Sequence, residues 1–498
     1  MMDLTQLRDQ IDQIDAQLIR LFCQRMQVAA QVADYKRKNG LPIYHPGREQ
    51  QVLQKVSDAA DPELRDYTRS LYERMFELSR SYQSSLNRKT VKSGLLGRKL
   101  GHSYSPQIHS YLGDYSYDLF EKEPEEIGDF IRNGDFTGIN VTIPYKKDVI
   151  PFLDELSPAA VKMGSVNTVI RRDDGTLYGH NTDYFGFTSM VSRSGINVSG
   201  KKVLVLGSGG TSNTAVKALA DLGAEVIIIS RSGENNYRNL HLHHDASVII
   251  NTTPVGMYPN TGSAPVDLRQ FPQLEGVLDV IYNPARTQLL MDAETLGLPH
   301  ENGLWMLVAQ AKEAAEYFCG HPLADDLIGT VYEKMSCNMH NIVLIGMPGC
   351  GKSTVGAHLA DELGRVFVDA DAKIRERAGK NIPEIFEEDG EAYFRQLETE
   401  VLAELGKQSS LVIATGGGCV TQARNYPLLH QNGRIIWLLR DLDLLATDGR
   451  PLSAKQKLSD MYDARRHLYE SFADYRVGND KSCQETVRQI ISILEGNP

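Results

Sequence analysis

Two glycine-rich segments constrain the fold of this 498-residue chain more than any other feature. GMPGCGKS at 346–353 follows the apolar run NIVLI, and GSGGTSNTAV at 207–216 follows KVLVL. A glycine-rich turn between a buried strand and a helix lets backbone N–H groups face phosphate oxygens at the start of the helix. Both segments therefore predict α/β folds that bind nucleotides.

The length is too great for one ordinary hydrophobic core, and about three domains are expected. The N-terminal region has helical periodicity. Two regions follow it in which predicted strands and helices alternate. We expect an all-α three-helix domain at 1–88, an α/β domain at 93–335 and a second α/β domain at 339–498. The middle one is expected to divide into a substrate-binding part, 93–190, and a Rossmann nucleotide-binding part, 191–335.

The composition limits the kinds of molecule that the chain is expected to bind. The formal net charge of −11 argues against nucleic acid as a ligand. No apolar run is long enough to cross a bilayer, and the polar, acidic start MMDLTQLRDQID is not that of a signal peptide. The six cysteines show neither C-x-x-C spacing nor a disulfide pattern, so we expect reduced thiols, a cytoplasmic location and no membrane partner.

The segment at 346–353 has the spacing G-x-x-x-x-G-K-S, which is typical of a loop around the phosphates of ATP. Lys352 is expected to reach the terminal phosphates and Ser353 to hold Mg²⁺. In FVDAD, Asp369 and Asp371 lie two apart at the end of a predicted strand, where one orders Mg²⁺ and the other accepts a hydroxyl proton. The remaining nucleotide-binding positions are Gly346, Gly349, Gly351 and Thr354.

Further along the same domain, the residues suit a small carboxylated phosphoryl acceptor. FRQLE places Arg395 one helical turn before Glu398, and ARRHLY supplies Arg465. Two arginines can hold a carboxylate through paired hydrogen bonds. The glycines of ATGGG let a substrate approach the backbone, and Arg450 in GRPL is placed to close over the phosphates.

Together these segments resemble shikimate kinase over 339–498. The resemblance implies that Asp371 is the base for the shikimate hydroxyl and that Arg450 is the lid arginine. It assigns the shikimate carboxylate and the walls of its site to Arg395, Arg465, Gly416, Gly417 and Gly418. A narrower alternative keeps the nucleotide loop but gives it a different small polyol acceptor.

The other glycine-rich loop has Gly207, Gly209 and Gly210, with Ser212 in place of the third glycine of the dinucleotide pattern. At the end of the next predicted strand, ISRSGEN has no acid at the tip to take a ribose 2′-hydroxyl. Ser230, Arg231 and Ser232 instead offer hydroxyls and a cation to a 2′-phosphate, which favours NADP(H) over NAD.

Upstream of that loop, four short motifs carry polar residues suited to a polyol acid. In HSYSP, Ser103 and Ser105 are expected on one side of an extended segment. Lys146 in NVTIPYKKD and Asp183 in HNTDYFG make a plausible proton-transfer pair if they share a cleft. Taken singly, each has an ordinary alternative, a surface turn for Lys146 and a helix cap for Asp183.

The set as a whole resembles shikimate dehydrogenase over 93–320. The resemblance implies that Lys146 and Asp183 flank the hydroxyl that is oxidised. It assigns the substrate carboxylate to Ser103 and Ser105, and places Tyr282 and Gly303 near substrate and nicotinamide. The other substrate-binding positions that it implies are Asn140, Thr142, Asn167 and Gln310.

The N-terminal region has one long helical pattern over 3–38, with an apolar stripe that Arg25 interrupts. A stripe of this length is typical of coiled-coil-like or intertwined helices. A buried guanidinium needs a partner, because burying it unpaired costs several kcal/mol. The cations, acid and amide nearby suit a compact dicarboxylate. They equally suit an interhelical ion-pair cluster that fixes the register of a dimer.

The motifs LRDQIDQID, QR, YK, PGRE and S-x-x-x-Q resemble the all-helical class of chorismate mutase over 3–86. The resemblance implies that Lys36, Gln83 and Glu49 act on the ether and hydroxyl oxygens of chorismate. Carboxylate and neighbouring binding positions would be Arg8 (from a second subunit), Arg25, Arg48 and Ser79. His45 replaces an acid found in many relatives.

These resemblances predict a trifunctional enzyme that makes shikimate from 3-dehydroshikimate, phosphorylates it, and converts chorismate to prephenate. It would use NADPH, ATP and Mg²⁺ and form a homodimer through its N-terminal helices. The alternative is a bifunctional dehydrogenase and kinase whose helical domain only binds chorismate or prephenate, or only dimerises.

Overall fold

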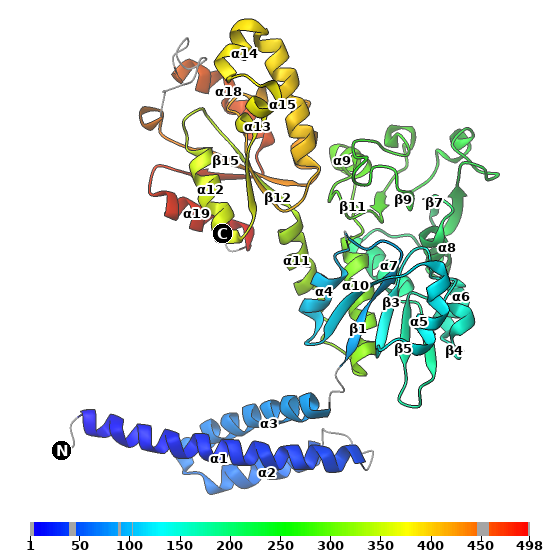
Figure 1. Cartoon of the computed structure of the whole chain (residues 1–498), viewed down its shortest axis with the longest axis vertical. Coiled ribbons are helices and arrows are strands. Elements are labelled where there is room, and N and C mark those ends of the chain that lie inside the picture. The colour runs from blue at the N-terminus through cyan, green and yellow to red at the C-terminus, as the bar shows by residue number, and fades with distance from the viewer. Residues whose placement is uncertain (1–3, 39–45, 88–90, 102, 446–457, 497–498) are drawn as a thin grey trace. The chain divides into compact units, whose positions relative to one another are not determined.

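The computed structural model describes residues 4–38, 46–87, 91–101, 103–445 and 458–496 (Figure 1). The chain divides into two compact units, Met1–Lys92 and Ser93–Pro498.

The first unit is all helical. Its helices are α1 (Leu4–Lys38), α2 (Pro46–Ala59) and α3 (Arg65–Asn87), and both α1 and α2 pack against α3 (Figure 1). The long helix predicted at the N-terminus is thus confirmed. Pro46 starts α2, a position where the missing N–H of proline costs nothing.

The apolar stripe of α1 is largely uncovered within a single chain. Ile11, Ile14, Leu18 and Leu21 are each more than half exposed. Burying four such side chains would contribute several kcal/mol, on the order of 1.5–3 kcal/mol each. This face of α1 therefore remains an exposed apolar surface when only one chain is considered.

The second unit contains three sheets. The first has the strand order β2-β1-β3-β5-β6-β4 and is mixed, because β5 pairs antiparallel with both β3 and β6. A short turn at Asp173–Gly175 joins β5 to β6, which permits the antiparallel pair. Its elements are β1 (Lys92–Gly97), α4 (Ser105–Leu112), β2 (Ser116–Glu121), α5 (Ile127–Asn133), β3 (Gly138–Val141), β4 (Glu155–Leu156), α6 (Pro158–Met163), β5 (Thr168–Arg171) and β6 (Leu177–His180).

The second sheet is parallel, with the order β11-β10-β9-β7-β8. The side chains of β9 are buried throughout, as expected for a parallel strand covered on both faces. This confirms the doubly wound fold predicted for the Rossmann part. Its elements are α7 (Asp183–Ser194), β7 (Lys202–Leu206), α8 (Gly210–Asp221), β8 (Glu225–Ile229), β9 (Val248–Asn251), β10 (Gly276–Asp279), α9 (Gln288–Thr295), β11 (His300–Glu301), α10 (Leu304–Cys319) and α11 (Leu327–Met339).

The third sheet is also parallel, with the order β13-β14-β12-β15-β16, and its central strand β12 is completely buried. The predicted strand before the nucleotide loop is thus confirmed. Its elements are β12 (Asn341–Ile345), α12 (Lys352–Leu363), β13 (Val366–Asp369), α13 (Ala370–Ala378), α14 (Ile382–Glu388), α15 (Gly390–Gly406), β14 (Leu411–Ala414), α16 (Asn425–His430), β15 (Gly433–Leu439), α18 (Leu458–Phe472), β16 (Tyr475–Gly478) and α19 (Cys483–Leu494).

The joint between the two α/β parts is short and hydrogen-bonded. Helix α11 ends one residue before β12 begins. Arg365 of the third sheet's region donates to the carbonyls of Cys337 and His340, both at 2.8 Å. From the Rossmann side, the backbone N–H of Ala285 donates to Asn432 Oδ1 at 2.9 Å. These contacts join the two parts within one compact unit.

No helix in the described part of the chain has the length and apolar character needed to span a membrane. All six cysteines are free thiols.

An aromatic cluster packs α4 against the first sheet. His109 is buried, its ring is stacked on Tyr117 with centroids 3.9 Å apart, and Phe318 lies on the same cluster. Its Nδ1 shares a 2.6 Å hydrogen bond with the Tyr115 hydroxyl. Burial lowers the pKa of His109 to about 3, so the folded protein holds this imidazole neutral.

This neutral histidine should make the first sheet and the helices packed on it sensitive to acid. Its folded pKa is depressed, so its contribution to stability is present above pH 6.5 and is lost as the pH falls towards about 3. The free energy of unfolding should fall as the pH drops from 6.5 to about 5. We expect this fall to be about 2 kcal/mol smaller in His109→Phe. In a Trp437→Phe background, urea unfolding followed by Trp305 fluorescence measures it, and an unchanged pH slope would contradict it.

Candidate functional sites

The first α/β part holds a cavity of about 310 Å³. It brings together all the substrate-binding residues predicted for this part, although they come from five separate segments. They are Ser103, Ser105, Asn140, Thr142, Lys146, Asn167, Tyr282 and Gln310.

Lys146 and Asp183 form an ion pair at the edge of this cavity. Lys146 Nζ donates to Asp183 Oδ2 at 2.5 Å, and the two side chains are 28% and 12% exposed. Asp183 is the first residue of α7, so its carboxylate also lies at the positive end of a helix. The surface-turn and helix-cap alternatives do not account for a direct contact between the two residues.

Asn167 holds the acid in place. Its Nδ2 donates to Asp183 Oδ1 at 3.0 Å and contacts Gln310 Oε1 at 3.2 Å, while its Oδ1 accepts from the N–H of Thr182. Because Gln310 belongs to α10, the network reaches across the fold to a helix that follows the Rossmann sheet. The site is thus rigid on the side of the ion pair.

The serines differ from the sequence-based expectation in one respect. Ser103 and Ser105 were expected on an extended segment, but Ser105 begins α4 and its N–H donates to Ser103 Oγ at 3.2 Å. Pro106 explains the difference, since proline is favoured in the first turn of a helix. Both hydroxyls still line the cavity.

The dinucleotide loop joins β7 to α8. Gly207 has φ of 114°, which only glycine adopts easily. Ser212 is accommodated because its buried hydroxyl donates to the Gly207 carbonyl at 2.8 Å. A Cβ on Gly209 or Gly210 would meet nothing within 4 Å, so both leave open space beside the start of the helix. This geometry fits a dinucleotide phosphate.

The predicted NADP-selecting residues follow β8 directly. Arg231 and Ser232 are exposed, whereas Ser230 is buried and its N–H donates to the Asn235 carbonyl. The exposed cation suits a 2′-phosphate. Gly303 directly precedes α10 as its N-cap, and a larger residue does not fit there because its Cβ would lie 2.0 Å from the Val280 carbonyl oxygen.

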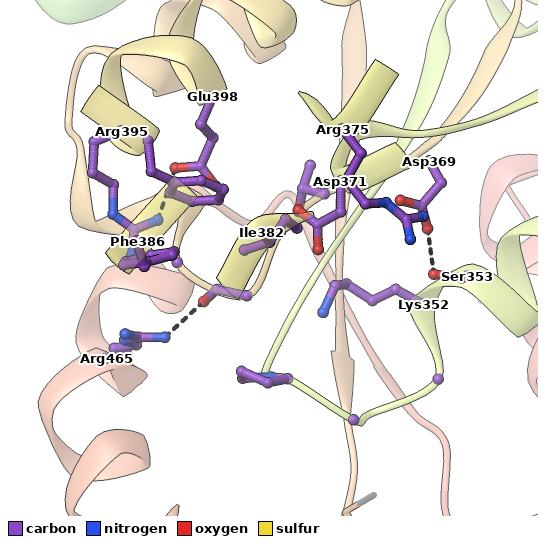
Figure 2. Close-up of a pocket in the computed structure, with 18 of the residues that line it drawn as sticks. Lys352, Ser353, Asp369, Asp371, Arg375, Ile382, Phe386, Arg395, Glu398 and Arg465 are labelled. Atoms are coloured by element: carbon purple, nitrogen blue, oxygen red, sulfur yellow. Dashed lines mark hydrogen bonds and ion pairs between the residues drawn. The ribbon is translucent and has the colours of Figure 1, made fainter. Parts of the chain in front are cut away.

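The third sheet carries a cavity of about 480 Å³ at the carboxyl ends of its strands (Figure 2). In Figure 2, Lys352 and Asp371 point into the same space from different elements, with Ser353 and Asp369 on one side and Arg395 and Glu398 on the other. The lining includes nearly all the predicted residues of this part, namely Gly349, Gly351, Lys352, Ser353, Thr354, Asp369, Asp371, Arg395, Gly416, Gly417, Gly418 and Arg465.

The nucleotide loop has the backbone that its glycines predict. Gly346, Gly349 and Gly351 all have positive φ values, at 148°, 85° and 93°. Lys352 is buried and donates to the carbonyls of Gly346 and Met347 at 2.9 and 3.1 Å, so it is held over the loop. The loop therefore fits the phosphates of ATP.

Ser353 donates to Asp369 Oδ2 at 2.6 Å, which brings together the two groups predicted to hold Mg²⁺. No group of three or more His, Cys, Asp and Glu side chains among the described residues forms a metal site of its own. A Mg²⁺ ion here would depend on this pair and on the nucleotide. The two acids do not share a strand as expected, because β13 ends at Asp369 and Asp371 lies in α13.

Arg395 is held by two acids of its own helix. It donates to Glu398 Oε2 at 2.9 Å and to Glu391 Oε1 at 3.2 Å. Burial raises the pKa of Glu398 despite the guanidinium beside it, and Asp371 adds to the rise. Burial alone would lower the pKa of Arg395, but these two acids outweigh it and the pKa is raised.

The glycines of ATGGG leave the space that these side chains occupy. A Cβ on Gly416 would lie 2.8 Å from both Asp371 Oδ1 and Glu398 Oε1, and one on Gly418 would lie 2.5 Å from the Arg395 guanidinium. Arg465 donates to the Gly417 carbonyl at 3.1 Å. Arg450 lies outside the described residues.

In the helical unit, Arg25 matches the expectation of a cation set into an apolar face. Its guanidinium lies over the Phe76 ring at 5.5 Å, and Nη1 is buried without a hydrogen-bond partner among the described residues. Ser79 is buried on α3, Glu49 is partly buried on α2, and Arg8 is exposed on α1. Lys36, Arg48 and Gln83 lie in helices, but their side chains are outside the described residues, as is His45.

Comparison with known proteins gives a relative for the middle of the chain. A shikimate dehydrogenase (NADP(+)) from Clostridium perfringens is 36% identical over 266 residues, covering 49% of this chain and 98% of the relative. One from Syntrophomonas wolfei is 38% identical over 270 residues, covering 47% and 91%. This chain belongs to the shikimate dehydrogenase family.

Three family models match successive parts of the chain: chorismate mutase type II at 7–84, the shikimate dehydrogenase substrate binding domain at 95–169, and shikimate kinase at 348–495. A solved chorismate mutase/shikimate 5-dehydrogenase fusion protein from Clostridium acetobutylicum is 34% identical, covering 50% of this chain and 98% of its own, with a TM-score of 0.48. The chain is a trifunctional shikimate-pathway enzyme that uses NADP and ATP.

Sequence reasoning missed several lining residues. Arg440 directly follows β15 beside the nucleotide loop, and Arg375 lies one turn after Asp371 in the kinase cavity. The sequence could have indicated both. Arg440 follows a predicted parallel strand, where functional groups gather, and Arg375 lies one helical turn from Asp371. No such pattern indicates His109 of the dehydrogenase cavity, since its place depends on the aromatic cluster.

We expect Gly418→Ala to damage the kinase selectively. Gly418 has an ordinary φ of −104°, so the substitution adds only a methyl group, which must displace the Arg395 guanidinium. The KM for the phosphoryl acceptor should rise about tenfold or more, with NADP-dependent activity unchanged. Gly329→Ala is the control, because a Cβ there meets nothing within 4 Å. An unaltered KM in Gly418→Ala would show that Arg395 does not need its present position.

Proposed function

We propose that this chain reduces 3-dehydroshikimate to shikimate with NADPH, phosphorylates shikimate with ATP, and rearranges chorismate to prephenate. The reduction is assigned to the domain at 93–335, the phosphorylation to the domain at 339–498, and the rearrangement to the helical domain at 1–88. The observation that carries the two α/β assignments is that each cavity sets a proton-transfer group beside groups for a small acid. These are the Lys146–Asp183 pair in one cavity, and Asp371 beside Arg395 in the other.

In the dehydrogenase domain, the loop between β7 and α8 and the side chain of Arg231 would hold NADPH, which would supply the hydride for the carbonyl carbon of the substrate. Lys146 Nζ donates a proton to the carbonyl oxygen as it becomes a hydroxyl, and Asp183 keeps the ammonium group directed at that oxygen. Ser103 and Ser105 bind the substrate carboxylate. The hydroxyls are held by Asn140, Thr142, Asn167 and Gln310, with Tyr282 at the cavity wall.

In the kinase domain, ATP supplies the phosphoryl group. Asp371 accepts the proton of the shikimate hydroxyl, while Arg395 and Arg465 hold the carboxylate that fixes the ring. Lys352 moves from the loop carbonyls to the terminal phosphates, and Arg440 adds positive charge beside the loop. Ser353 and Asp369 are placed for Mg²⁺.

The two assignments are tested by crossed variants of the full chain. We expect Lys146→Met to lower the turnover of shikimate oxidation about 10²–10⁴-fold and to leave shikimate phosphorylation intact, because it removes the proton-transfer group of one site. Asp371→Asn should do the reverse, by a similar factor. The assays are NADPH absorbance and coupled ADP release. A variant that lowers both activities equally would contradict separate sites.

The helical domain is proposed to act as a mutase in a homodimer. Chorismate rearrangement is unimolecular, so it requires only a site that restrains the substrate and stabilises charge on the breaking ether. The buried Nη1 of Arg25 and the exposed stripe of α1 support a site completed by a second copy, which would contribute Arg8. The free thiols and the nucleotide cofactors support a cytoplasmic location.

Chorismate consumption by the purified chain separates this proposal from its alternative. We expect prephenate formation by the full chain and a loss of about 10²-fold or more with Arg25→Ala, because the substrate carboxylate loses its cation. Leu18→Glu, on the exposed stripe, should both dissociate the dimer and abolish turnover. A folded chain without turnover, in which chorismate changes the other two activities, would instead make this domain a regulatory module.

A further inference from the structure

A third cavity, of about 520 Å³, lies inside the unit 93–498 where the Rossmann part meets the kinase part. It belongs to neither site described above. The loop after β10, helices α7 and α11, and strands β11, β15 and β16 line it. Most of its lining side chains are polar or charged.

Two arginines dominate this cavity, one from each part. Arg286, from the Rossmann side, donates through Nη1 to the His430 carbonyl at 3.0 Å. Arg434, on β15 of the kinase side, donates through Nη1 to the Leu494 carbonyl at 3.0 Å. Neither has a carboxylate within 4.0 Å among the described residues. Two partly buried guanidinium groups thus share one cavity without counter-charges in contact.

The acids that line the cavity have other partners. Glu301 forms an ion pair with Arg193, whose guanidinium also lies over the Tyr332 ring at 4.3 Å. Asp474 accepts the backbone N–H of Ile435 at 2.7 Å. Neither acid therefore neutralises the guanidinium groups of Arg286 and Arg434 by direct contact.

The pKa of a histidine that lines this cavity shows the effect of the nearby positive charges. Burial lowers the pKa of His340 to about 4 against the opposing effect of the Ser336 carbonyl, and Arg286, Arg434 and Arg365 lower it further. Positive charge from both parts of the unit therefore converges on one point, in a chain whose net charge is −11.

We propose that this cavity binds a small phosphate dianion, either inorganic phosphate or a phosphate monoester, between Arg286 and Arg434. A guanidinium presents paired N–H donors that match the oxygens of a phosphate, and the two guanidinium groups supply the positive charge that attracts an anion. Asn302, Ser336 and Tyr475 supply further polar groups around the cavity. The bound dianion bridges the two catalytic parts.

Calorimetric titration of the full chain tests the site. The protein is first saturated with NADP⁺ and Mg–ADP so that the known phosphate-binding loops are occupied, and is then titrated with inorganic phosphate or with glycerol 3-phosphate. We expect saturable binding with one site per chain. Tighter binding of one probe identifies the source of the dianion as free phosphate or a monoester.

Arg286→Gln and Arg434→Gln should each weaken binding about tenfold or more, and the double variant should show none. The control is Arg98→Gln/Arg269→Gln, which removes the same charge from exposed positions that already pair with Glu123 and Asp267. If the double variant does not fold, the single variants decide, with dehydrogenase and kinase activities as checks of folding. Equal binding by all variants, or no saturable binding by the parent chain, would overturn the proposal.

Discussion

Burial of parallel strands on both faces is the constraint on which both α/β parts depend. Strands such as β9 and β12 expose no side chain, so they carry no chemistry along their length. Polar groups can emerge only where the strands end, and parallel pairing brings those ends to one edge. The same requirement that makes the core apolar therefore concentrates the nucleotide loops and the acidic groups at single edges of the sheets.

This constraint also explains which parts of the sites could be predicted from the sequence. The loops at 207–216 and 346–353 are local, and their glycines have the required backbone angles, so spacing alone indicates them. Asp183 and Lys146 lie in different segments of the chain, and the family resemblance places them together; their 2.5 Å contact depends on the tertiary fold, which brings the start of α7 to the segment after β3. Residues placed by tertiary packing alone, such as His109, left no pattern to recognise.

Local rules failed where two of them competed. The alternation of Ser103 and Ser105 suggested an extended segment, but Pro106 favours a helix start and prevails. Asp371 was assigned to a strand end with Asp369, yet Asp369 caps α13 and accepts the N–H of Ala372, so the helix begins between the two acids. In both cases the side chains still reach the cavity, because one residue of helix displaces a Cβ by only a few ångströms.

The joint between the dehydrogenase and the kinase has a consequence for how such a gene can change. Arg365 donates to carbonyls at the end of α11, and Asn432 Oδ1 accepts the N–H of Ala285. The kinase part thus supplies hydrogen-bond partners for backbone groups of the dehydrogenase part. A descendant in which the gene was split at this point would expose those groups to water in both products. Separating the two parts again is therefore harder than joining them, because separation needs compensating substitutions on both of the surfaces that become exposed.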